Sequence, residues 1–246
     1  MPYERSWANE NELADYVPSL DPSHSLPSSR VLVARSVETQ ELALLKLVVK
    51  ASVKLDRHHR TLIESSLLRA ASIRSAHISL TNYIEHRWTR HGLVVVSEYL
   101  DDAAQLRKAR MPDIERLARI WIGLVEGVAH IHQQRSVHGD IRSANIVVNS
   151  LNQGFIVDYD LAEPIKDLSH SHFDGVLTAT KLEKLQRADA NKLRNVVISS
   201  LQRAQCYSIS PAIAATAIRR IRKSGREHAS NEKISRLQDA LQFLST

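Results

Sequence analysis

SVHGDIRSANIVV (136–148) and IVDYDLAEP (156–164) are two nearby stretches that hold polar residues at fixed offsets between apolar runs. Asp140 precedes Asn145 by five residues (145 − 140), and Asp158 follows Asn145 by 13 (158 − 145). The runs NIVV and GFIVDY predict a short strand pair that gives these residues rigid supports. Carboxylate and amide oxygens are ligands that Mg²⁺ prefers. The pattern therefore predicts metal-assisted phosphoryl transfer, with Asp140 near the acceptor hydroxyl and with Asn145 and Asp158 as metal ligands.

A long helix is predicted directly before this motif. The stretch PDIERLARIWIGLVEGVAHIHQQ (112–134) has Pro112 near its start, where proline suits a helix. Its apolar residues recur at steps of three and four, so one side must pack against a core. These residues are Ile114, Leu117, Trp121, Leu124, Val125, Val128 and Ile131.

Farther upstream the pattern changes to strands around a single helix. RVLVARS (30–36) and ELALLKLVVK (41–50) predict a hairpin, and ISLTNYIEHRW (78–88) and GLVVVSEYL (92–100) predict two more strands. Between these pairs, residues 56–74 have helical spacing, with Asp56 as the N-cap. The first 30 residues are rich in Pro, Ser and Asn and predict a loop or a loosely attached arm.

The order of strands, one helix, strands and then mostly helices predicts an α+β fold. The last 70 residues have helical patterns and lack strand signals. We expect an N-terminal arm over 1–22, a small β-rich lobe with one helix over 23–98, and a reduced, mostly helical lobe over 99–246. A length of 246 residues suits such a two-lobed unit.

HGDIRSAN with DYD resembles the catalytic loop and metal-binding triplet of the protein kinase superfamily, and ALLK (43–46) resembles its strand motif with a phosphate-binding lysine. The resemblance covers roughly 23–161 and implies a bilobal kinase-like fold that uses ATP and Mg²⁺. It implies that Asp140 accepts the acceptor proton and that Asn145 and Asp158 hold the metal. It also implies that Lys46, paired with Glu64 of the upstream helix, positions the phosphates.

The stretch VVVSEYL resembles the strand that leads into the hinge between the kinase lobes. The resemblance implies Ser97 as gatekeeper and Glu98 to Leu100 as hinge. It also implies that the nucleotide contacts Val31, 15 residues before Lys46, and Val147 after the catalytic loop. Farther along, Asp189 is expected on the helix that braces the catalytic loop.

The phosphate-binding loop departs from the kinase pattern. Counting back from Val31, the glycine positions of G-x-G-x-x-G are His24, Leu26 and Ser29, so every glycine is absent. Glycine there allows close backbone approach to phosphate, and Pro27 also removes a backbone donor. We therefore expect a weaker or differently shaped phosphate lid.

The catalytic segments depart as well. Gly139 stands where many kinases carry an arginine that meets a phosphorylated loop, so we expect no activation by loop phosphorylation. The HGD sequence is similar to small atypical kinases of the KEOPS type and to aminoglycoside phosphotransferases. Asp160 replaces the triplet glycine, as in divergent fungal-type kinases and some small-molecule kinases. No A-P-E is present.

Three functions stay open on these residues. The favoured one is a divergent protein kinase that transfers the γ-phosphate of ATP to a protein hydroxyl, because all five polar residues of the site are present. A pseudokinase that binds a regulatory protein partner is the alternative indicated by the missing glycines and A-P-E. A small-molecule kinase is the alternative indicated by HGD and the short tail.

Composition indicates an ordinary globular protein, with 43% apolar residues and a net charge of +6 that favours anionic partners. The single Cys206, the polar N-terminus and the lack of a long apolar run predict a cytoplasmic protein without a membrane segment. The five basic residues of 219–226 fit a solvated helix end better than a nucleic-acid arm, because no aromatic residues interleave them. The spacing of His58, His59, His130, His132 and His138 does not predict a metal site.

Overall fold

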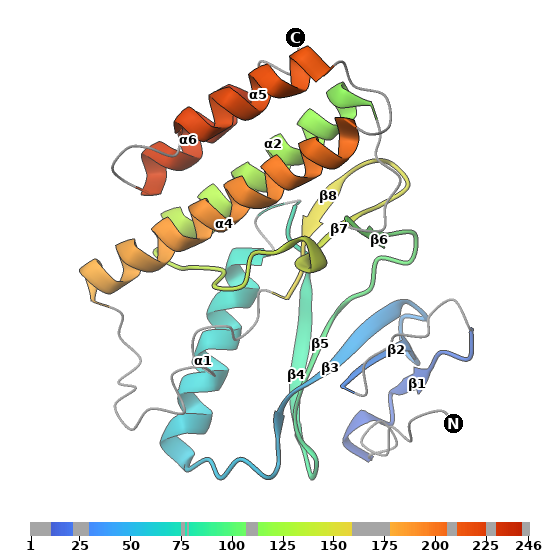
Figure 1. The fold of residues 1–246 in the computed structure, drawn as a ribbon. Helices are drawn as coiled ribbons and strands as arrows, with labels where there is room; N and C mark the ends of the chain where they lie inside the picture. Colours follow the sequence, from blue (N-terminus) through green and yellow to red (C-terminus); the bar gives the residue numbers. More distant parts are fainter. Residues whose placement is uncertain are drawn as a thin grey trace. The chain divides into compact units, whose positions relative to one another are not determined.

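The computed structural model describes residues 11–21, 30–74, 77, 79–106, 113–158, 178–205, 211–224 and 230–242. The chain divides into two compact units, one formed by 1–75 with 81–101 and the other by 76–80 with 102–246. The described elements confirm the predicted α+β class, because the first unit holds an antiparallel sheet and one long helix while the second is mostly helical (Figure 1).

The first unit is built on a five-stranded sheet in the order β1-β2-β3-β5-β4, with every neighbouring pair antiparallel. Both predicted strand pairs are confirmed. The strands are β1 (Tyr16–Pro18), β2 (Val31–Ser36), β3 (Leu42–Lys50), β4 (Tyr83–Thr89) and β5 (Gly92–Glu98). Gly92 makes the turn before β5 possible, because its φ is +132° and an added Cβ would lie 1.8 Å from the Val49 carbonyl oxygen.

The loop predicted for the N-terminal residues is wrong for the part that the structure describes. Residues Asn11–Leu13 form a 3-10 turn, η2, and β1 then pairs with β2. Leu13 packs against one face of the sheet, and Tyr16 of β1 projects from that same face into an apolar cluster. The sheet side of this cluster consists of Leu32, Ala34, Ala43, Leu45, Leu47, Val94 and Val96.

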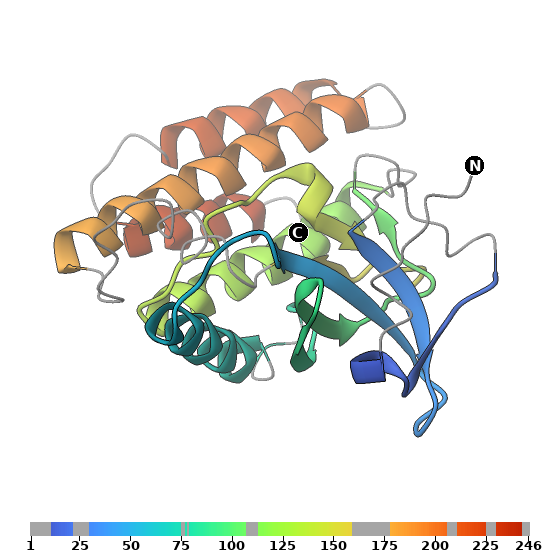
Figure 2. The same ribbon diagram turned by 90° about the horizontal axis from the view of Figure 1, so that it is seen from below.

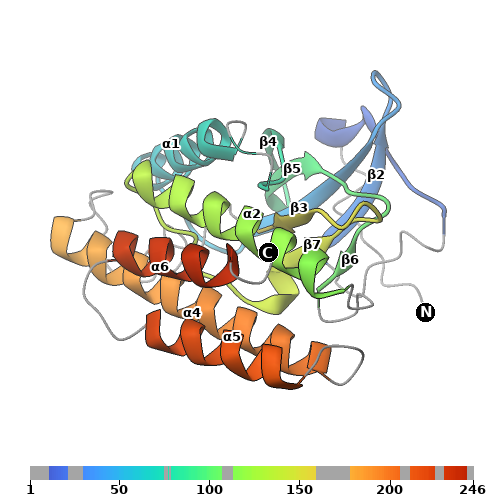
Figure 3. The same ribbon diagram turned by 90° about the horizontal axis from the view of Figure 1, so that it is seen from above.

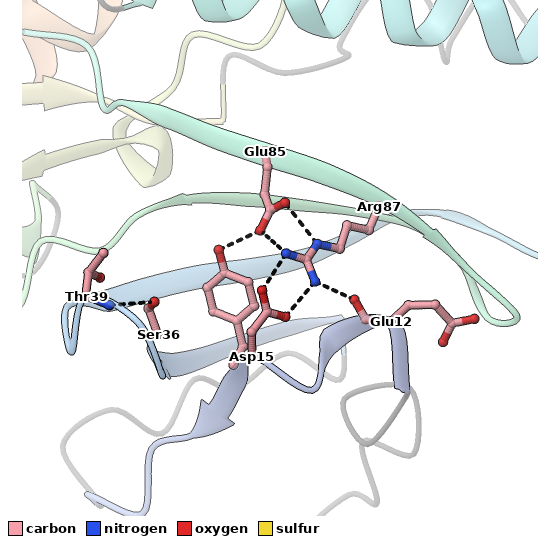
Figure 4. A network of polar contacts seen from close by, with 7 residues as sticks. Glu12, Asp15, Ser36, Thr39, Glu85 and Arg87 are labelled. Carbon is pink, nitrogen blue, oxygen red and sulfur yellow. Dashed lines mark hydrogen bonds and ion pairs between the residues drawn. The ribbon is translucent and has the colours of Figure 1, made fainter.

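A polar network fastens this segment to β4 (Figure 4). The guanidinium of Arg87 donates to both carboxylate oxygens of Asp15 at 2.6 Å and to the Glu12 carbonyl oxygen at 2.7 Å. It also contacts the Glu85 carboxylate at 2.7 and 2.9 Å, and Glu85 accepts from the Tyr16 hydroxyl at 2.7 Å. Burial, with the hydrogen bond to Glu85, raises the pKa of Tyr16. The hydroxyl therefore stays a donor at neutral pH.

Helix α1 (Arg57–Arg74) contacts β4 in the same unit. Asp56 is its N-cap, as predicted, because its carboxylate accepts from the His59 backbone N–H at 2.8 Å. At the other end, the buried guanidinium of Arg74 donates to the carbonyl and hydroxyl oxygens of Thr81. Figure 2 shows α1 and the segment 11–18 separated by the strands of the sheet.

The second unit holds four α-helices among the described residues, which pack side by side (Figure 3). They are α2 (Ile114–Gln133), α4 (Ala179–Gln205), α5 (Pro211–Ser224) and α6 (Ser230–Gln242). Helix α6 contacts each of the other three. The apolar stripe predicted for α2 is buried from Leu117 to Ile131. Within the described ranges, no helix is long and apolar enough to cross a membrane.

A small antiparallel sheet, in the order β6-β7-β8, lies beside the HGDIRSAN motif (138–145), which by its kinase resemblance is called the catalytic loop. Its strands are β6 (Ala104–Gln105), β7 (Ile146–Val148) and β8 (Gly154–Ile156), and a 3-10 turn, η4 (Ser143–Asn145), precedes β7. Gly154 lies against α2, where an added Cβ would stand 2.8 Å from Ile120 Cγ2. The glycine therefore lets β8 approach the helix that leads into the catalytic loop.

Candidate active site

Asp140 and Asn145 are joined directly by hydrogen bonds. The Asn145 amide nitrogen donates to the Asp140 side-chain Oδ2 and to its backbone carbonyl, each at 3.0 Å. Asn145 is 3% exposed, whereas the Asp140 side chain is 41% exposed. Because the amide nitrogen faces Asp140, the amide oxygen points away from that carboxylate. The exposed Asp140 carboxylate can thus meet an acceptor, and the Asn145 amide oxygen is the candidate cation ligand.

Arg142 is a residue of this site that the sequence analysis did not assign. Its Nε lies 3.1 Å from Asp140 Oδ2, and its side chain is 60% exposed. The sequence feature that could have identified Arg142 is its position as a basic residue two places after Asp140. The pair places a cation beside the candidate proton acceptor.

His138 links the loop of Asp140 to the segment that carries Asp158. Its Nδ1 accepts from the Asp140 backbone N–H at 3.2 Å, and its Nε2 lies 3.1 Å from the Val157 carbonyl oxygen. The imidazole is therefore neutral, with its proton on Nε2 donating to Val157. Burial lowers the pKa of His138, although the nearby carboxylate of Asp189 opposes this shift.

Asp158 has a φ of +63°, in the left-handed region that non-glycine residues seldom adopt. One residue earlier, the Val157 N–H donates to the Asn145 carbonyl oxygen at 2.9 Å. A backbone hydrogen bond thus joins Asn145, one predicted metal ligand, to the residue directly before Asp158, the other. Asp160 lies outside the described residues.

Helix α4 braces the catalytic loop through one face. Asp189, 1% exposed, accepts from the backbone N–H groups of His138 at 2.6 Å and of Gly139 at 3.0 Å. Three residues to either side, Gln186 donates to the carbonyls of His132 and Ser136, and Lys192 donates to that of Gly139. Spacings of three residues place these side chains on one helix face. The expected bracing role of Asp189 is confirmed by these contacts.

In the first unit, the strand register places Lys46 among the other predicted nucleotide contacts. Lys46 lies opposite Val31 on β2 and opposite Val95 on β5. Directly opposed residues share a face, and so do residues two apart on one strand. Val31, Lys46 and Ser97 therefore share one face of the sheet, and the apolar cluster with Leu13 and Tyr16 occupies the other.

Glu64 is held by a residue that the sequence analysis missed. The indole Nε1 of Trp88 on β4 donates to Glu64 Oε1 at 2.7 Å. A tryptophan 24 positions after a helix glutamate forms no recognisable sequence motif with it, so the contact could not be predicted from the spacing. The pairing of Glu64 with Lys46 stays a prediction.

The predicted hinge begins in the sheet. Ser97 is buried, and Glu98 exchanges backbone and side-chain hydrogen bonds with Asn82, its Oε2 accepting from the Asn82 N–H at 3.1 Å. Leu100, and Val147 on β7 of the second unit, are half-buried. His24, Leu26 and Ser29, which stand at the positions of the kinase loop glycines, lie outside the part of the chain that the structure describes.

The other sequence features have plain structural settings. Among the described residues, no group of three or more His, Cys, Asp or Glu side chains could hold a metal ion. Of the basic run, Arg219, Arg220 and Arg222 are exposed on α5.

Comparison with known proteins gives one consistent result. The family model of the protein kinase domain matches residues 27–181. A serine/threonine-protein kinase US3 homolog of Equine herpesvirus 1 is 26% identical over 170 residues, which cover 68% of this chain and 42% of that protein. Cell division control protein 2 homolog 3 of Trypanosoma brucei brucei is 27% identical over 143 residues, or 54% of this chain and 44% of that protein. The chain spans less than half the length of either relative.

Proposed function

Because the chain belongs to the protein kinase domain family, we propose that it is an ATP-dependent phosphotransferase that transfers the γ-phosphate of ATP to a protein hydroxyl. The observation that carries this proposal is the bonded pair of Asp140 and Asn145, which the His138 and Asp189 contacts hold in place. A purely structural loop does not require an exposed carboxylate beside an oriented amide oxygen.

In the proposed reaction, Asp140 orients the acceptor hydroxyl and accepts its proton as the oxygen attacks the γ-phosphorus. The bond between the γ-phosphorus and the β–γ bridging oxygen breaks, and ADP leaves. Arg142 places positive charge beside Asp140, where charge on the transferred group can be stabilised. Lys46, paired with Glu64, holds the α- and β-phosphates. Val31, Val147 and Leu100 would contact the adenosine. Ser97 would lie behind the adenosine as gatekeeper. Glu98 would contribute its backbone, since its side chain is bonded to Asn82.

The donor set of Asn145 and Asp158 fits Mg²⁺. This ion is usually bound by one or two protein oxygens, with waters and substrate phosphates completing its octahedron. When bound, it neutralises charge that develops on the phosphates. The orientation of the Asn145 amide, fixed by its two bonds to Asp140, supports this assignment.

The first test is thermal unfolding with saturating ATP, with and without Mg²⁺. A ligand at about 100 times its Kd adds about 2.7 kcal/mol, which for a chain of this size is a Tm rise of roughly 5–10 °C. We expect this shift in the wild type and in Asp140→Asn, and its loss in Asp158→Ala. Asp140→Asn should lower phosphotransfer by about 10²-fold or more. The exposed Asp239→Asn on α6 is the matched control.

A regulatory binding module is the second candidate, favoured by the absence of every glycine in the stretch before Val31. Such a module would keep its partner binding and show no turnover with protein or small-molecule acceptors. A wild type without any nucleotide shift, or an Asp140→Asn variant that transfers phosphate at the wild-type rate, would count against the kinase.

A further inference from the structure

Trp88 on β4 is fixed against α1 by two contacts. Its indole N–H donates to Glu64 Oε1 at 2.7 Å, and the Arg60 guanidinium carbon lies 4.8 Å from the centroid of its ring. Arg60 and Glu64 are one helical turn apart, so the ring spans one turn of α1. Trp88 and Glu64 are both half-buried. A hydrogen bond in such a setting holds the carboxylate in one orientation more firmly than one exposed to water.

The strand register places this contact on the face of the sheet that carries Lys46. Trp88 lies opposite Leu93 on β5, and Lys46 lies opposite Val95 on the same strand. Leu93 and Val95 are two residues apart, so both pairs project from one face. Trp88 is two strands from Lys46, a separation of about 10 Å across the sheet. The carboxylate held by Trp88 therefore lies over the surface from which Lys46 projects.

The chemistry of the contact complements an ion pair. An indole N–H is a neutral donor with no acceptor, so it fixes a carboxylate oxygen without cancelling the negative charge. A carboxylate has two oxygens with about four acceptor sites, so Oε2 can accept from a lysine ammonium while Oε1 accepts from Trp88. A lysine alone is a flexible point charge and orients its partner poorly.

We infer that Trp88 is a positioning residue, whose indole N–H orients the Glu64 carboxylate for pairing with Lys46 and so helps to place the nucleotide phosphates. This inference rests on the proposed function, because the Lys46–Glu64 pair belongs to it. It adds Trp88, a residue outside the catalytic motifs, to those on which phosphate binding depends.

The test compares Trp88→Phe with wild type by isothermal titration against ATP with Mg²⁺ and, separately, against adenosine. Phenylalanine keeps an aromatic ring beneath Arg60 and removes the N–H donor together with the pyrrole part of the indole; the adenosine titration reports any effect of the lost ring volume on the sheet. We expect the Kd for ATP to rise about threefold to tenfold, as for the loss of one hydrogen bond. The Kd for adenosine should not change, because adenosine has no phosphates. Arg60→Gln, which keeps the indole hydrogen bond, is the matched control and should bind ATP as the wild type does.

A second comparison uses Glu64→Gln alone and together with Trp88→Phe. If Trp88 acts through the Glu64 carboxylate, the double variant should bind ATP no more weakly than Glu64→Gln. An unchanged ATP affinity in Trp88→Phe would overturn the inference, and so would equal losses for ATP and adenosine, which indicate a distorted sheet. Tighter ATP binding would overturn it too, because Trp88 would then compete with Lys46. A wild type that binds no ATP would refute the proposed function itself, and the inference with it.

Discussion

The catalytic loop and the five-stranded sheet are each fastened by one charged side chain with several partners, but the two side chains have different surroundings. Asp189 is 1% exposed and accepts from two backbone N–H groups. The Arg87 side chain is 28% exposed and bonds Asp15, Glu85 and a backbone carbonyl. A buried charge must find its partners inside the protein, whereas a half-exposed charge can be rehydrated when a partner is lost. The two hydrogen bonds of Asp189 should therefore affect stability more than the five of Arg87.

The largest effect is expected from Asp189→Asn. In the wild type, the backbone N–H groups of His138 and Gly139 each donate to one Asp189 carboxylate oxygen. Asparagine replaces one of these oxygens with an N–H₂ group, so one buried N–H donor loses its acceptor. We expect a loss of about 2–4 kcal/mol, or a Tm lower by roughly 5–15 °C, together with a loss of phosphotransfer. Thermal unfolding followed by circular dichroism measures this. An Asp189→Asn variant as stable as Asp239→Asn would break the comparison.

The same buried loop should make stability sensitive to acid. His138 is neutral and its pKa is lowered by burial, so near pH 6.5 the unfolded chain binds more protons than the folded protein. The contribution of His138 is fully present above about pH 6.5 and is lost as the pH falls toward the lowered folded pKa. Protonation would also remove the Nδ1 acceptor of the Asp140 N–H.

Urea unfolding between pH 7.5 and 5 without Mg²⁺ measures this dependence, with His138→Gln as the comparison. Glutamine does not titrate in this range, so its variant should have the shallower pH profile. Parallel profiles for the two proteins would show that other groups cause the acid sensitivity.

A smaller effect is expected from Arg87→Met. Methionine keeps much of the apolar stem, while the contacts with Asp15, Glu85 and the Glu12 carbonyl are lost. We expect a loss of about 1–2 kcal/mol, because exposed ion pairs contribute about 0.2–1 kcal/mol each. The loss should shrink at high salt. A loss as large as that of Asp189→Asn would contradict the difference drawn from burial.

The smallest effect is expected from Tyr16→Phe. This change removes the hydroxyl that donates to Glu85 and keeps the ring in the apolar cluster. Since Glu85 keeps Arg87 as a partner, we expect a loss of about 0.5–1 kcal/mol. Paired with Arg87→Met in a double-mutant cycle of urea unfolding, it measures the coupling within the network. Strictly additive losses would show that the two contacts act independently.

Local patterns in the sequence predicted much of this fold. The hairpin of β2 and β3, the Asp56 cap of α1 and the buried stripe of α2 each have a signal within one element. The five-residue spacing of Asp140 and Asn145 likewise predicted that these two residues belong to one site. The three-residue strands β7 and β8 were predicted because each lies in an apolar run, whereas β6 and β1 lie outside such runs and are too short for an alternating pattern.

The contacts that support the site had no such signal. Asp189 lies 51 residues from His138, and Asp15 lies 72 from Arg87. A side chain that meets a distant backbone N–H or guanidinium needs no periodic neighbours, so single-sequence reasoning cannot select it. Asp189 was identified through the family resemblance, while Trp88 and Arg87 emerged only from the folded arrangement.

The segment 11–18 has a practical consequence for anyone who shortens this chain. The family match begins at residue 27, which makes that position a natural place to cut an expression fragment. A fragment cut there would lack Leu13 and Tyr16 and would uncover the apolar face formed by Leu45, Val94 and Val96. Exposed apolar patches of this kind promote aggregation. The shortest fragment that resists aggregation should therefore begin before Asn11, upstream of residue 27, where the family match begins.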